Sequence, residues 1–527
     1  MGDPASQRDD LPGGNRRLPG RKAASRYCGP AFPVYLQAMI AVAFDNSYKR
    51  LPQRFFAEVA PTPVAAPRLI RLNTALASEL GLDADWLQGP AGVAMLSGNA
   101  MPLGAASIAT AYAGHQFGGF SPQLGDGRAI LVGEVIDPKG TRHDLQLKGA
   151  GPTPFSRRGD GRAALGPVLR EYLVSEAMAA LGVPTTRALA AVLTGEAVRR
   201  ETLLPGAILT RVASSHIRIG TFQYFAARGD LEALRHLADH VISRHYPACS
   251  GEKRYLDLLG AVIEAQAALV AQWMAIGFIH GVMNTDNMSI AGETIDFGPC
   301  AFMDAYHPTT VFSSIDEHGR YSFGNQPPIA LWNLTRFAET LLPLLAEDQD
   351  EAIRLAQTAL DRFDLQFQSR LIAGFRRKLG LFTEEAEDFA LIKELLDTMQ
   401  AGATDFTLVF RSLAEQMQQE SPDACRALFG DPARFDAWVG RWRQRLARET
   451  ASVAARQDMM LSTNPLYIPR NHQIEAAIEA AVERDDFGPF ELLLSVLERP
   501  FDAQPGREAF ARPPATHERV LATFCGT

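Results

Sequence analysis

The hydrophobic pattern of the chain is strand-like in its first part and helical in its second. Residues 130–135 form an apolar segment in which Glu134 is the one charged residue, and residues 143–148 alternate polar and apolar side chains, as a half-buried β-strand does. Residues 208–220 predict another strand followed by a turn. Leucines at helical spacing within residues 68–87 predict an early helix.

A second early helix is expected over residues 166–182, because Pro167 suits a first helical turn and an apolar stripe follows it. From about residue 229 onwards, apolar positions recur at helical spacing. Residues 258–278 are the most apolar long stretch, but Glu264 and two glutamines lie within it, so we expect a buried helix. Further helices are predicted at 332–345, 350–379, 384–400, 406–417 and 432–449, and from Gln473 onwards.

Length and composition indicate a globular protein with at least two packed units. Of its 527 residues, 46% are hydrophobic and 21% are charged, which are ordinary values. The formal net charge of −8 argues against a general binder of nucleic acid or of anionic membranes. We therefore expect neither partner, and any phosphate-binding site must be local.

The cysteines indicate a reducing compartment. None of them forms a Cys-x-x-Cys pair, which argues against a zinc ribbon or a dense disulfide framework. We expect a cytoplasmic monomer. The cysteines are Cys28, Cys249, Cys300, Cys425 and Cys525.

Residues 1–40 are predicted to be a disordered N-terminal extension, since their first part is rich in Arg, Gly and Pro. Acidic residues within it argue against a transit peptide, and no signal-peptide core follows its basic residues. Met39 is an alternative start, because ordered-looking sequence begins just after it.

A polar loop within residues 277–298 carries the most informative motif. An apolar run leads to a His-Gly turn, the pair Asp286-Asn287, a short apolar strand and the triplet Asp296-Phe297-Gly298. Kinase-like folds present their catalytic loop and magnesium-binding Asp-Phe-Gly in this order. In a kinase, the Asp that acts as the catalytic base lies five residues before the metal-binding Asn. Counting back five residues from Asn287 gives Val282 here. The usual phosphoryl-transfer base is therefore absent.

These elements predict an α+β, protein-kinase-like fold with two lobes. A mixed β/α N-lobe that binds nucleotide is expected over residues 41–225. A mainly helical C-lobe with extra helices, the catalytic loop and the metal site is expected over residues 226–480, followed by a C-terminal tail over 481–527 that contains Cys525.

Phosphate-binding features surround one predicted strand. The pentapeptide Gly-Asp-Gly-Arg-Ala occurs at 125–129 and again at 159–163, and the strand between them ends in Lys148. Lys148 followed by Glu171 on the next helix matches the ion pair that orients a kinase lysine on ATP phosphates. Each feature alone has a plainer interpretation, as a turn or a surface residue. Together they favour a phosphate pocket, to which several arginines add charge: Arg128, Arg157, Arg158, Arg162, Arg211 and Arg218.

Asn287 and Asp296 form an amide–carboxylate pair that suits a hard cation such as Mg²⁺. Asp286, next to the amide, is able to accept a proton from a hydroxyl. A loop-capping Asp is the plainer interpretation of Asp286 in isolation.

Taken together, these motifs resemble the selenoprotein O family of kinase-like protein adenylyltransferases. The resemblance runs from about Phe44 to the end of the chain. The matching segments are Tyr112–Gly118, Gln123–Ala129, Leu145–Arg158, Gly159–Ala163, Gly281–Asn287, Asp296–Gly298 and Cys525–Thr527.

The resemblance implies that ATP lies flipped end for end in a kinase-like cleft. AMP would pass to a Ser, Thr or Tyr hydroxyl of a protein, and pyrophosphate would leave. Asp286 would be the base, Glu171 would pair with Lys148, and Asn287 with Asp296 would bind Mg²⁺, with Mn²⁺ as the alternative metal. The nucleotide site would comprise Gly125, Gly127, Arg128, Lys148, Asp160, Gly161, Arg211, Arg218 and Asp296.

Members of that family can pair a C-terminal Cys or Sec with a cysteine in the segment after Asp-Phe-Gly. Here that segment contains Cys300, very close to the motif, and the pairing of Cys300 with Cys525 stays open.

These residues are compatible with three functions. The first is adenylyl transfer to proteins, and the second is phosphoryl transfer from the γ-phosphate, which needs a base where Val282 stands. The third is a pseudokinase that binds nucleotide without catalysis.

Overall fold

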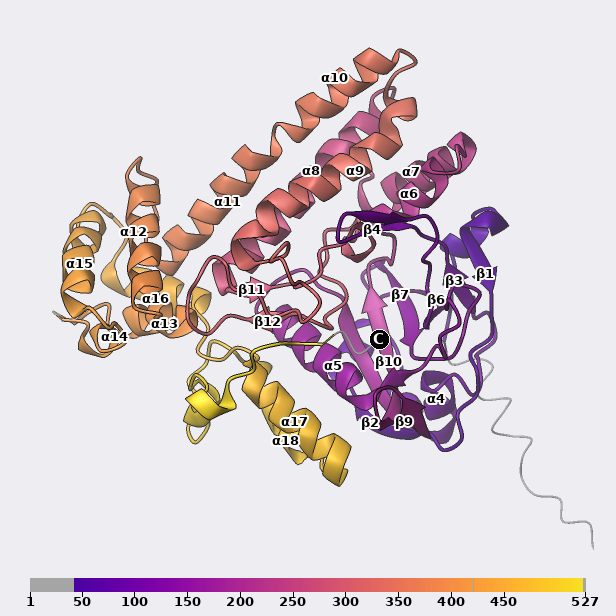
Figure 1. The fold of residues 1–527 in the computed structure, drawn as a ribbon, viewed down its shortest axis with the longest axis horizontal. Helices are drawn as coiled ribbons and strands as arrows, with labels where there is room; N and C mark the ends of the chain where they lie inside the picture. The colour runs from indigo at the N-terminus through magenta and orange to yellow at the C-terminus, as the bar shows by residue number, and fades with distance from the viewer. Residues whose placement is uncertain (1–41, 420, 525–527) are drawn as a thin grey trace, which may run out of the picture.

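The computed structural model describes residues 42–419 and 421–524 (Figure 1). It confirms the α+β class, with one large antiparallel sheet and many helices. The predictions for residues 1–40, for Met39 as a start and for Cys525 lie outside the described residues. The lobe boundaries stay predictions.

The sheet has eight strands in the order β1-β3-β6-β7-β10-β9-β2, with β8 paired to β10. Its long central strands are β6 (Ala129–Ile136), β7 (Arg142–Lys148), β9 (Arg187–Arg199) and β10 (Leu203–Ala213), and every pairing between its strands is antiparallel. The other strands are β1 (Phe56–Glu58), β2 (Arg68–Leu72), β3 (Ile108–Thr110) and β8 (Ala163–Ala164). A separate hairpin consists of β4 (Gly114–Gln116) and β5 (Gly119–Ser121).

Strand β7 is buried more completely than its alternating pattern predicts. Asp144 and Gln146 are buried together with the leucines between and after them. Asp144 accepts hydrogen bonds from Arg244 Nη2 at 2.6 Å and from the backbone N–H of His216 at 2.9 Å. Both faces of the sheet are covered, so the polar residues of β7 are satisfied by internal partners rather than by water.

The early helix predicted over 68–87 is wrong in its first part. Residues 68–72 form β2, which pairs with β9. The Asn73 side chain then caps α2 (Thr74–Glu79) by accepting from the backbone N–H of Leu76 at 3.0 Å. Two short helices follow, α3 (Ala84–Gln88) and α4 (Pro90–Leu96).

Helix α5 (Leu165–Ala180) confirms the second early helix, and it is buried on more than one side. It packs against β9 and β10 on one side and against α17 (Asn471–Arg484) and α18 (Gly488–Leu497) on the other. Helix α18 lies within the predicted C-terminal tail, and no helix was expected there. The packing on α5 ties α17 and α18, near the end of the chain, to the part of the molecule that contains the large sheet (Figure 1).

Helix α8 (Arg254–Ile276) is the centre of the helical part. It packs against α9 (Gln326–Leu345) and α11 (Phe363–Lys378), and residues such as Leu258 and Val262 are fully buried. By length and composition it is also the one described helix able to cross a membrane, but half of its most apolar window is buried inside the protein. The neighbouring helices are α6 (Ile219–Ala226), α7 (Leu231–His245) and α10 (Gln349–Leu360).

Five helices at one end of the molecule, away from the large sheet, contribute most of a second core, to which Phe375 of α11 also belongs (Figure 1). The helix predicted over 350–379 is in fact two, α10 and α11, since α10 packs mainly on α9 and α11 on α8. Helix α16 was not predicted. The five are α12 (Asp388–Ala401), α13 (Phe406–Glu415), α14 (Asp423–Arg426), α15 (Pro432–Leu446) and α16 (Val453–Thr463).

The segment after Asp-Phe-Gly is irregular, as predicted, until α9 begins at Gln326 rather than at Trp332. Its only strand among the described residues, β12 (Ala301–Phe302), pairs with β11 (Phe278–Ile279). The apolar strand expected after Asn287 is wrong: Ser289 makes one isolated bridge with Arg218 instead.

Lys378 is a buried cation without a carboxylate partner in the part of the chain that the structure describes. Its Nζ lies 4.4 Å from the ring centroid of Phe410 and 5.6 Å from that of Phe406. Burial lowers the pKa of Lys378 to about 7. The unfolded chain keeps the ordinary lysine pKa of 10.5. Between about pH 7 and 10.5, Lys378 is therefore protonated in the unfolded chain and largely neutral in the folded protein. Because the unfolded state binds more protons in this range, the contribution of Lys378 to the free energy of unfolding rises with pH.

We expect Lys378→Met to increase the free energy of unfolding at pH 7 on the order of 1–3 kcal/mol, because an apolar chain replaces a desolvated amine. The gain should shrink as the pH approaches 10. Thermal unfolding followed by near-ultraviolet circular dichroism at both pH values measures it. Lys393→Met, at an exposed i,i+4 pair with Asp397, is the control and should change little. Destabilisation by Lys378→Met at pH 7 would contradict the prediction.

Candidate active site

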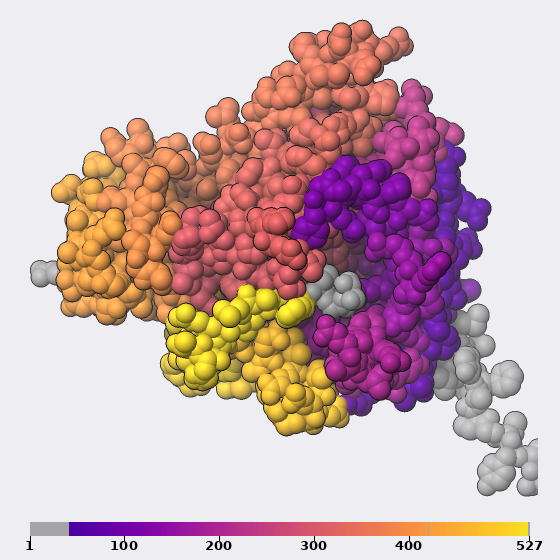
Figure 2. Space-filling model, viewed as in Figure 1, coloured from indigo at the N-terminus to yellow at the C-terminus, as the bar shows by residue number. Residues whose placement is uncertain are grey.

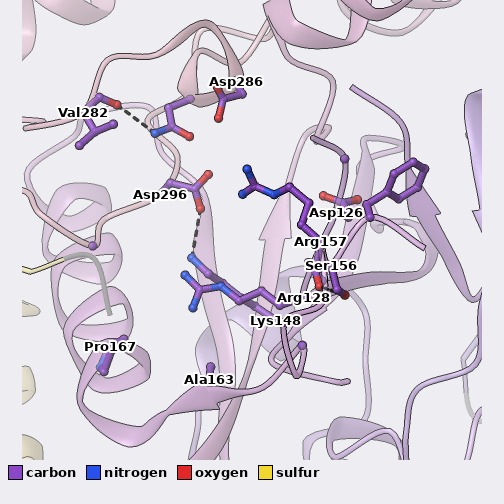
Figure 3. Close-up of a pocket in the computed structure, with 18 of the residues that line it drawn as sticks. Asp126, Arg128, Lys148, Ser156, Arg157, Ala163, Pro167, Val282, Asp286 and Asp296 are labelled. Atoms are coloured by element: carbon purple, nitrogen blue, oxygen red, sulfur yellow. Dashed lines mark hydrogen bonds and ion pairs between the residues drawn. The ribbon is translucent and has the colours of Figure 1, made fainter. Parts of the chain in front are cut away.

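A cavity of about 710 Å³ lies between the sheet and the catalytic loop. Strands β6, β7 and β10, helix α5 and the loop around residue 286 all contribute to its wall (Figure 3). Of the arginines that the sequence suggested for the phosphate pocket, Arg158 alone does not line this cavity. The residues that the resemblance assigned to the nucleotide, the metal and the base all line it, although their chemical roles stay predictions. They are Gly125, Gly127, Arg128, Lys148, Asp160, Gly161, Glu171, Arg211, Arg218, Asp286, Asn287 and Asp296.

Lys148, at the end of β7, bridges two carboxylates. Its Nζ lies 3.1 Å from Oδ1 of Asp296 (Figure 3) and 2.6 Å from Oε2 of Glu171 on α5. The expected pairing of Lys148 with Glu171 is therefore present in the structure. It forms because β7 and α5 both border the cavity and α5 follows the strand closely in sequence.

Two arginines complete this ionic cluster. Arg211 on β10 contacts Glu171 Oε1 at 2.5 Å and Asp296 Oδ1 at 2.6 Å, and Arg218 contacts Asp296 Oδ2 at 2.8 Å. Burial by itself would raise the pKa of Asp296, but Arg211, Lys148 and Arg218 together hold that pKa well below its ordinary value. Three cations thus lie beside the buried carboxylate of Glu171 and the half-buried carboxylate of Asp296, and Arg218 also lies 4.0 Å from buried Asp126. Cations gathered in this way suit the binding of a polyphosphate.

Asp286 is a buried carboxylate on the catalytic loop with little compensation. Its Oδ2 accepts a hydrogen bond from Gln116 Nε2 at 3.2 Å, and its Oδ1 has no partner among the described residues. Burial raises the pKa of Asp286 to about 6. Gly114 is required beside it, because a Cβ there would lie 2.3 Å from Oδ1.

Asn287 is oriented by the main chain of Val282. Its Nδ2 donates to the backbone carbonyl of Val282 at 3.0 Å (Figure 3). This bond leaves the side-chain oxygen of Asn287 without a hydrogen-bond donor among the described residues. Val282 therefore contributes its main chain to the site, while its side chain is chemically inert.

The donor set fits a magnesium ion held jointly with a nucleotide. No group of three His, Cys, Asp or Glu side chains in residues 42–419 and 421–524 is arranged to hold a metal by itself. The amide oxygen of Asn287 and the ionised Asp296 would supply two hard ligands, and Mg²⁺ usually adds phosphate and water oxygens to such a pair.

A family model described as protein adenylyltransferase SelO matches residues 38–498. The chain belongs to this family. Among its relatives are two proteins named protein nucleotidyltransferase YdiU, each covered over 99% of its own length and aligned with 92% of this chain. The one from Rhodopseudomonas palustris strain BisB5 is 65% identical over 486 residues, and the one from Bradyrhizobium sp. strain ORS 278 is 64% identical over 485.

Membership of the SelO family confirms the resemblance drawn from the motifs. It makes this chain an enzyme, a nucleotidyltransferase that adenylylates proteins.

Two residues that shape the site of this SelO family member, Asp126 and Arg200, were not predicted from the sequence. Asp126 is buried and accepts from the backbone N–H and hydroxyl of Thr110, at 3.0 and 2.6 Å. Arg200 pairs with Asp160 at 2.8 Å, so Asp160 is engaged by a neighbouring arginine. The first copy of the repeated pentapeptide pointed to Asp126, whereas no sequence signal marked Arg200.

Cys300 is not exposed for pairing. Its Sγ donates to the carbonyl of Phe297 at 3.1 Å, and burial raises the pKa of its thiol to about 12. Near the end of the chain, Thr523 Oγ1 donates to the carbonyl of Pro299 at 2.6 Å, and Thr523 forms a parallel bridge with Ser313. The described end of the chain therefore lies against the segment that follows Asp-Phe-Gly, while a pairing with Cys525 lies outside the described residues.

Proposed function

We propose that this protein transfers AMP from ATP to Ser, Thr or Tyr hydroxyls of other proteins, using Asp286 as the base and a kinase-like arrangement of its two lobes. The observation that carries this proposal is the placement of two residues on one cavity wall. Val282 stands where a kinase base would be, and Asp286 offers a carboxylate oxygen without a hydrogen-bond partner in the described chain.

The reaction is a displacement at the α-phosphorus of ATP. The acceptor hydroxyl gives its proton to Asp286 and forms a new O–P bond to the α-phosphorus, while the bond from the α-phosphorus to the bridging oxygen breaks. Pyrophosphate leaves with that oxygen. Lys148, Arg211 and Arg218 hold the phosphate oxygens and stabilise the charge on the leaving group.

Asn287 and Asp296 would hold Mg²⁺, or Mn²⁺ in its place. When bound, such a cation neutralises phosphate charge and orients the nucleotide. Glu171 keeps Lys148 and Arg211 in place through its two carboxylate oxygens. A monomeric, cytoplasmic protein remains our expectation from the sequence.

Intact-mass measurement tests the proposal directly. A protein acceptor incubated with the enzyme, ATP and Mg²⁺ should gain the mass of adenylyl groups. A gain in phosphoryl groups would support phosphotransfer instead. No gain in mass on any acceptor, with ATP still bound, would support the pseudokinase alternative.

Lys148→Met should lower kcat/KM for ATP about 10²-fold or more, because it removes a cation from the phosphate site and leaves Glu171 and Asp296 less compensated. Steady-state kinetics of pyrophosphate release measure this. Lys139→Met, on an exposed turn, is the matched control and should leave kcat/KM unchanged. A wild-type rate in Lys148→Met would remove Lys148 from the phosphate site.

A further inference from the structure

A second cavity, of about 620 Å³, adjoins the nucleotide cavity. It lies between the tip of the β4–β5 hairpin and the segment that follows Asp-Phe-Gly. Phe117 at the hairpin tip and Ile315 on that segment line both cavities, so the two cavities share these side chains as a common wall. Figure 2 shows the hairpin region against this segment on the face in view.

The hairpin is fixed to the catalytic loop. The backbone N–H of His115 donates to Thr285 Oγ1 at 2.7 Å, and that of Phe117 donates to Asn284 Oδ1 at 3.1 Å. Gln116, between them, donates to Asp286. The same strand pair therefore positions both the proposed base and the wall of the second cavity.

Phe117 is held at the junction by its backbone. It has a φ of 52° and is followed by Gly118 with a φ of 87°, so a two-residue turn joins the strands. A positive φ is costly for a bulky side chain and is maintained only where the surroundings enforce it. The strained conformation keeps a large ring at the boundary between the two cavities.

The opposite wall of the second cavity also contacts Asn284. Tyr321 donates its hydroxyl to Asn284 Oδ1 at 2.7 Å, and its ring lies 5.1 Å from that of Phe117. Buried Asp316 closes the preceding turn by accepting from the backbone N–H groups of Arg320 and Tyr321, both at 2.8 Å. Both walls of the second cavity are thus hydrogen-bonded to Asn284, two residues before Asp286.

The cavity lining combines apolar side chains with the guanidinium of Arg320 and the carboxylates of Asp316 and Glu317, and the Asp316 carboxylate is occupied by the backbone N–H groups of its own turn. Phe117 and Ile315 line the cavity and are exposed, and Phe120 is exposed on the same hairpin outside the cavity. Large exposed apolar side chains grouped in this way indicate a contact surface. Arg320 stacks over Trp332 at 4.9 Å from the ring centroid and has no ion pair in the part of the chain that the structure describes. The outer rim bears exposed Glu317 and His318.

We propose that this second cavity binds the acceptor polypeptide, and the inference rests on the proposed function. An apolar residue next to the acceptor hydroxyl packs against Phe117 and Ile315, and a nearby Asp or Glu of the acceptor pairs with Arg320. The hydroxyl then enters the nucleotide cavity past Phe117 and meets Asp286. This geometry assigns the enzyme a preference for hydroxyls with apolar and acidic neighbours.

A peptide array tests this preference with the full chain. Each synthetic peptide has a central Ser, Thr or Tyr, flanked either by Leu and Glu or by Ser and Lys, and the label is adenylate from α-labelled ATP. We expect the apolar and acidic peptides to be modified preferentially. Arg320→Gln and Ile315→Ser should each raise KM for the preferred peptide about tenfold, the effect of one interface contact worth about 1.4 kcal/mol.

Matched control variants distinguish an effect of the second cavity on peptide KM from a general effect of changing exposed residues. Ile353→Ser replaces an equally exposed isoleucine on α10, and Arg434→Gln removes an exposed arginine of α15. Both controls should keep the wild-type KM for the peptide. Unchanged peptide KM in Arg320→Gln and Ile315→Ser, with wild-type transfer intact, would overturn the inference.

The other outcomes are equally decisive. If light scattering shows that Ile315→Ser dissociates a dimer while peptide KM is unchanged, a second copy of this chain occupies the cavity and the inference fails. If the wild-type enzyme labels no peptide and no protein with adenylate, the proposed function itself fails, and the inference falls with it.

Discussion

Asp296→Asn should lower kcat/KM for adenylyl transfer by about 10³-fold. Asparagine keeps the shape of the side chain but removes the charge that Lys148, Arg211 and Arg218 share. Lys148 and Arg211 would then keep only Glu171 as a carboxylate partner, Arg218 would keep only Asp126, and the amide would also be a poorer metal ligand than the carboxylate. Transfer measured across a range of Mg²⁺ concentrations should show weakened metal dependence together with the loss of rate.

A control for Asp296→Asn is Asp436→Asn, which changes an exposed ion pair with Arg426 and should leave the rate unchanged. Thermal unfolding of both variants shows whether the fold is kept. Undiminished transfer by a folded Asp296→Asn enzyme would mean that the metal site is assigned to the wrong residue.

Asp286→Asn should lower kcat about 10²- to 10⁴-fold and leave KM for ATP near its wild-type value. The amide keeps the size of the side chain and removes its ability to take the proton from the acceptor hydroxyl. Because a buried carboxylate with one weak partner is replaced by a neutral group, the stability of the variant should equal or exceed that of wild type. Single-turnover kinetics and thermal unfolding measure the two effects.

Loss of rate with retained stability separates a catalytic role for Asp286 from that of a loop cap. A structural Asp would show the reverse pattern, with lowered stability and a rate that recovers at lower temperature. A variant with wild-type kcat would exclude Asp286 as the base.

The parts of the site that sequence predicted best are close together along the chain. Lys148 and Glu171 come from a strand and the helix that follows it, and Asp286 and Asp296 come from one loop region. Their motifs carry local signals of turn, strand end and helix start. Such signals are sufficient when the residues that meet are neighbours in sequence.

Contacts between distant segments left no comparable signal. Gln116 reaches Asp286 across 170 positions, and Arg68 to Leu72 became a strand because β9 was available to pair with it. The break between α10 and α11 has no Pro or Gly, and it reflects packing on two different helices. Tertiary contacts determine the Gln116–Asp286 hydrogen bond, strand β2 and the break between α10 and α11, and local sequence patterns do not predict such contacts.

The central claim is that the α-phosphorus of ATP, rather than the γ-phosphorus, is transferred to protein. Parallel reactions with α-labelled and γ-labelled ATP, the same protein acceptor and Mg²⁺ test it most directly. We predict labelled protein from the α-labelled nucleotide alone, and loss of that label in Asp286→Asn. Label entering the protein only from the γ position would contradict the account.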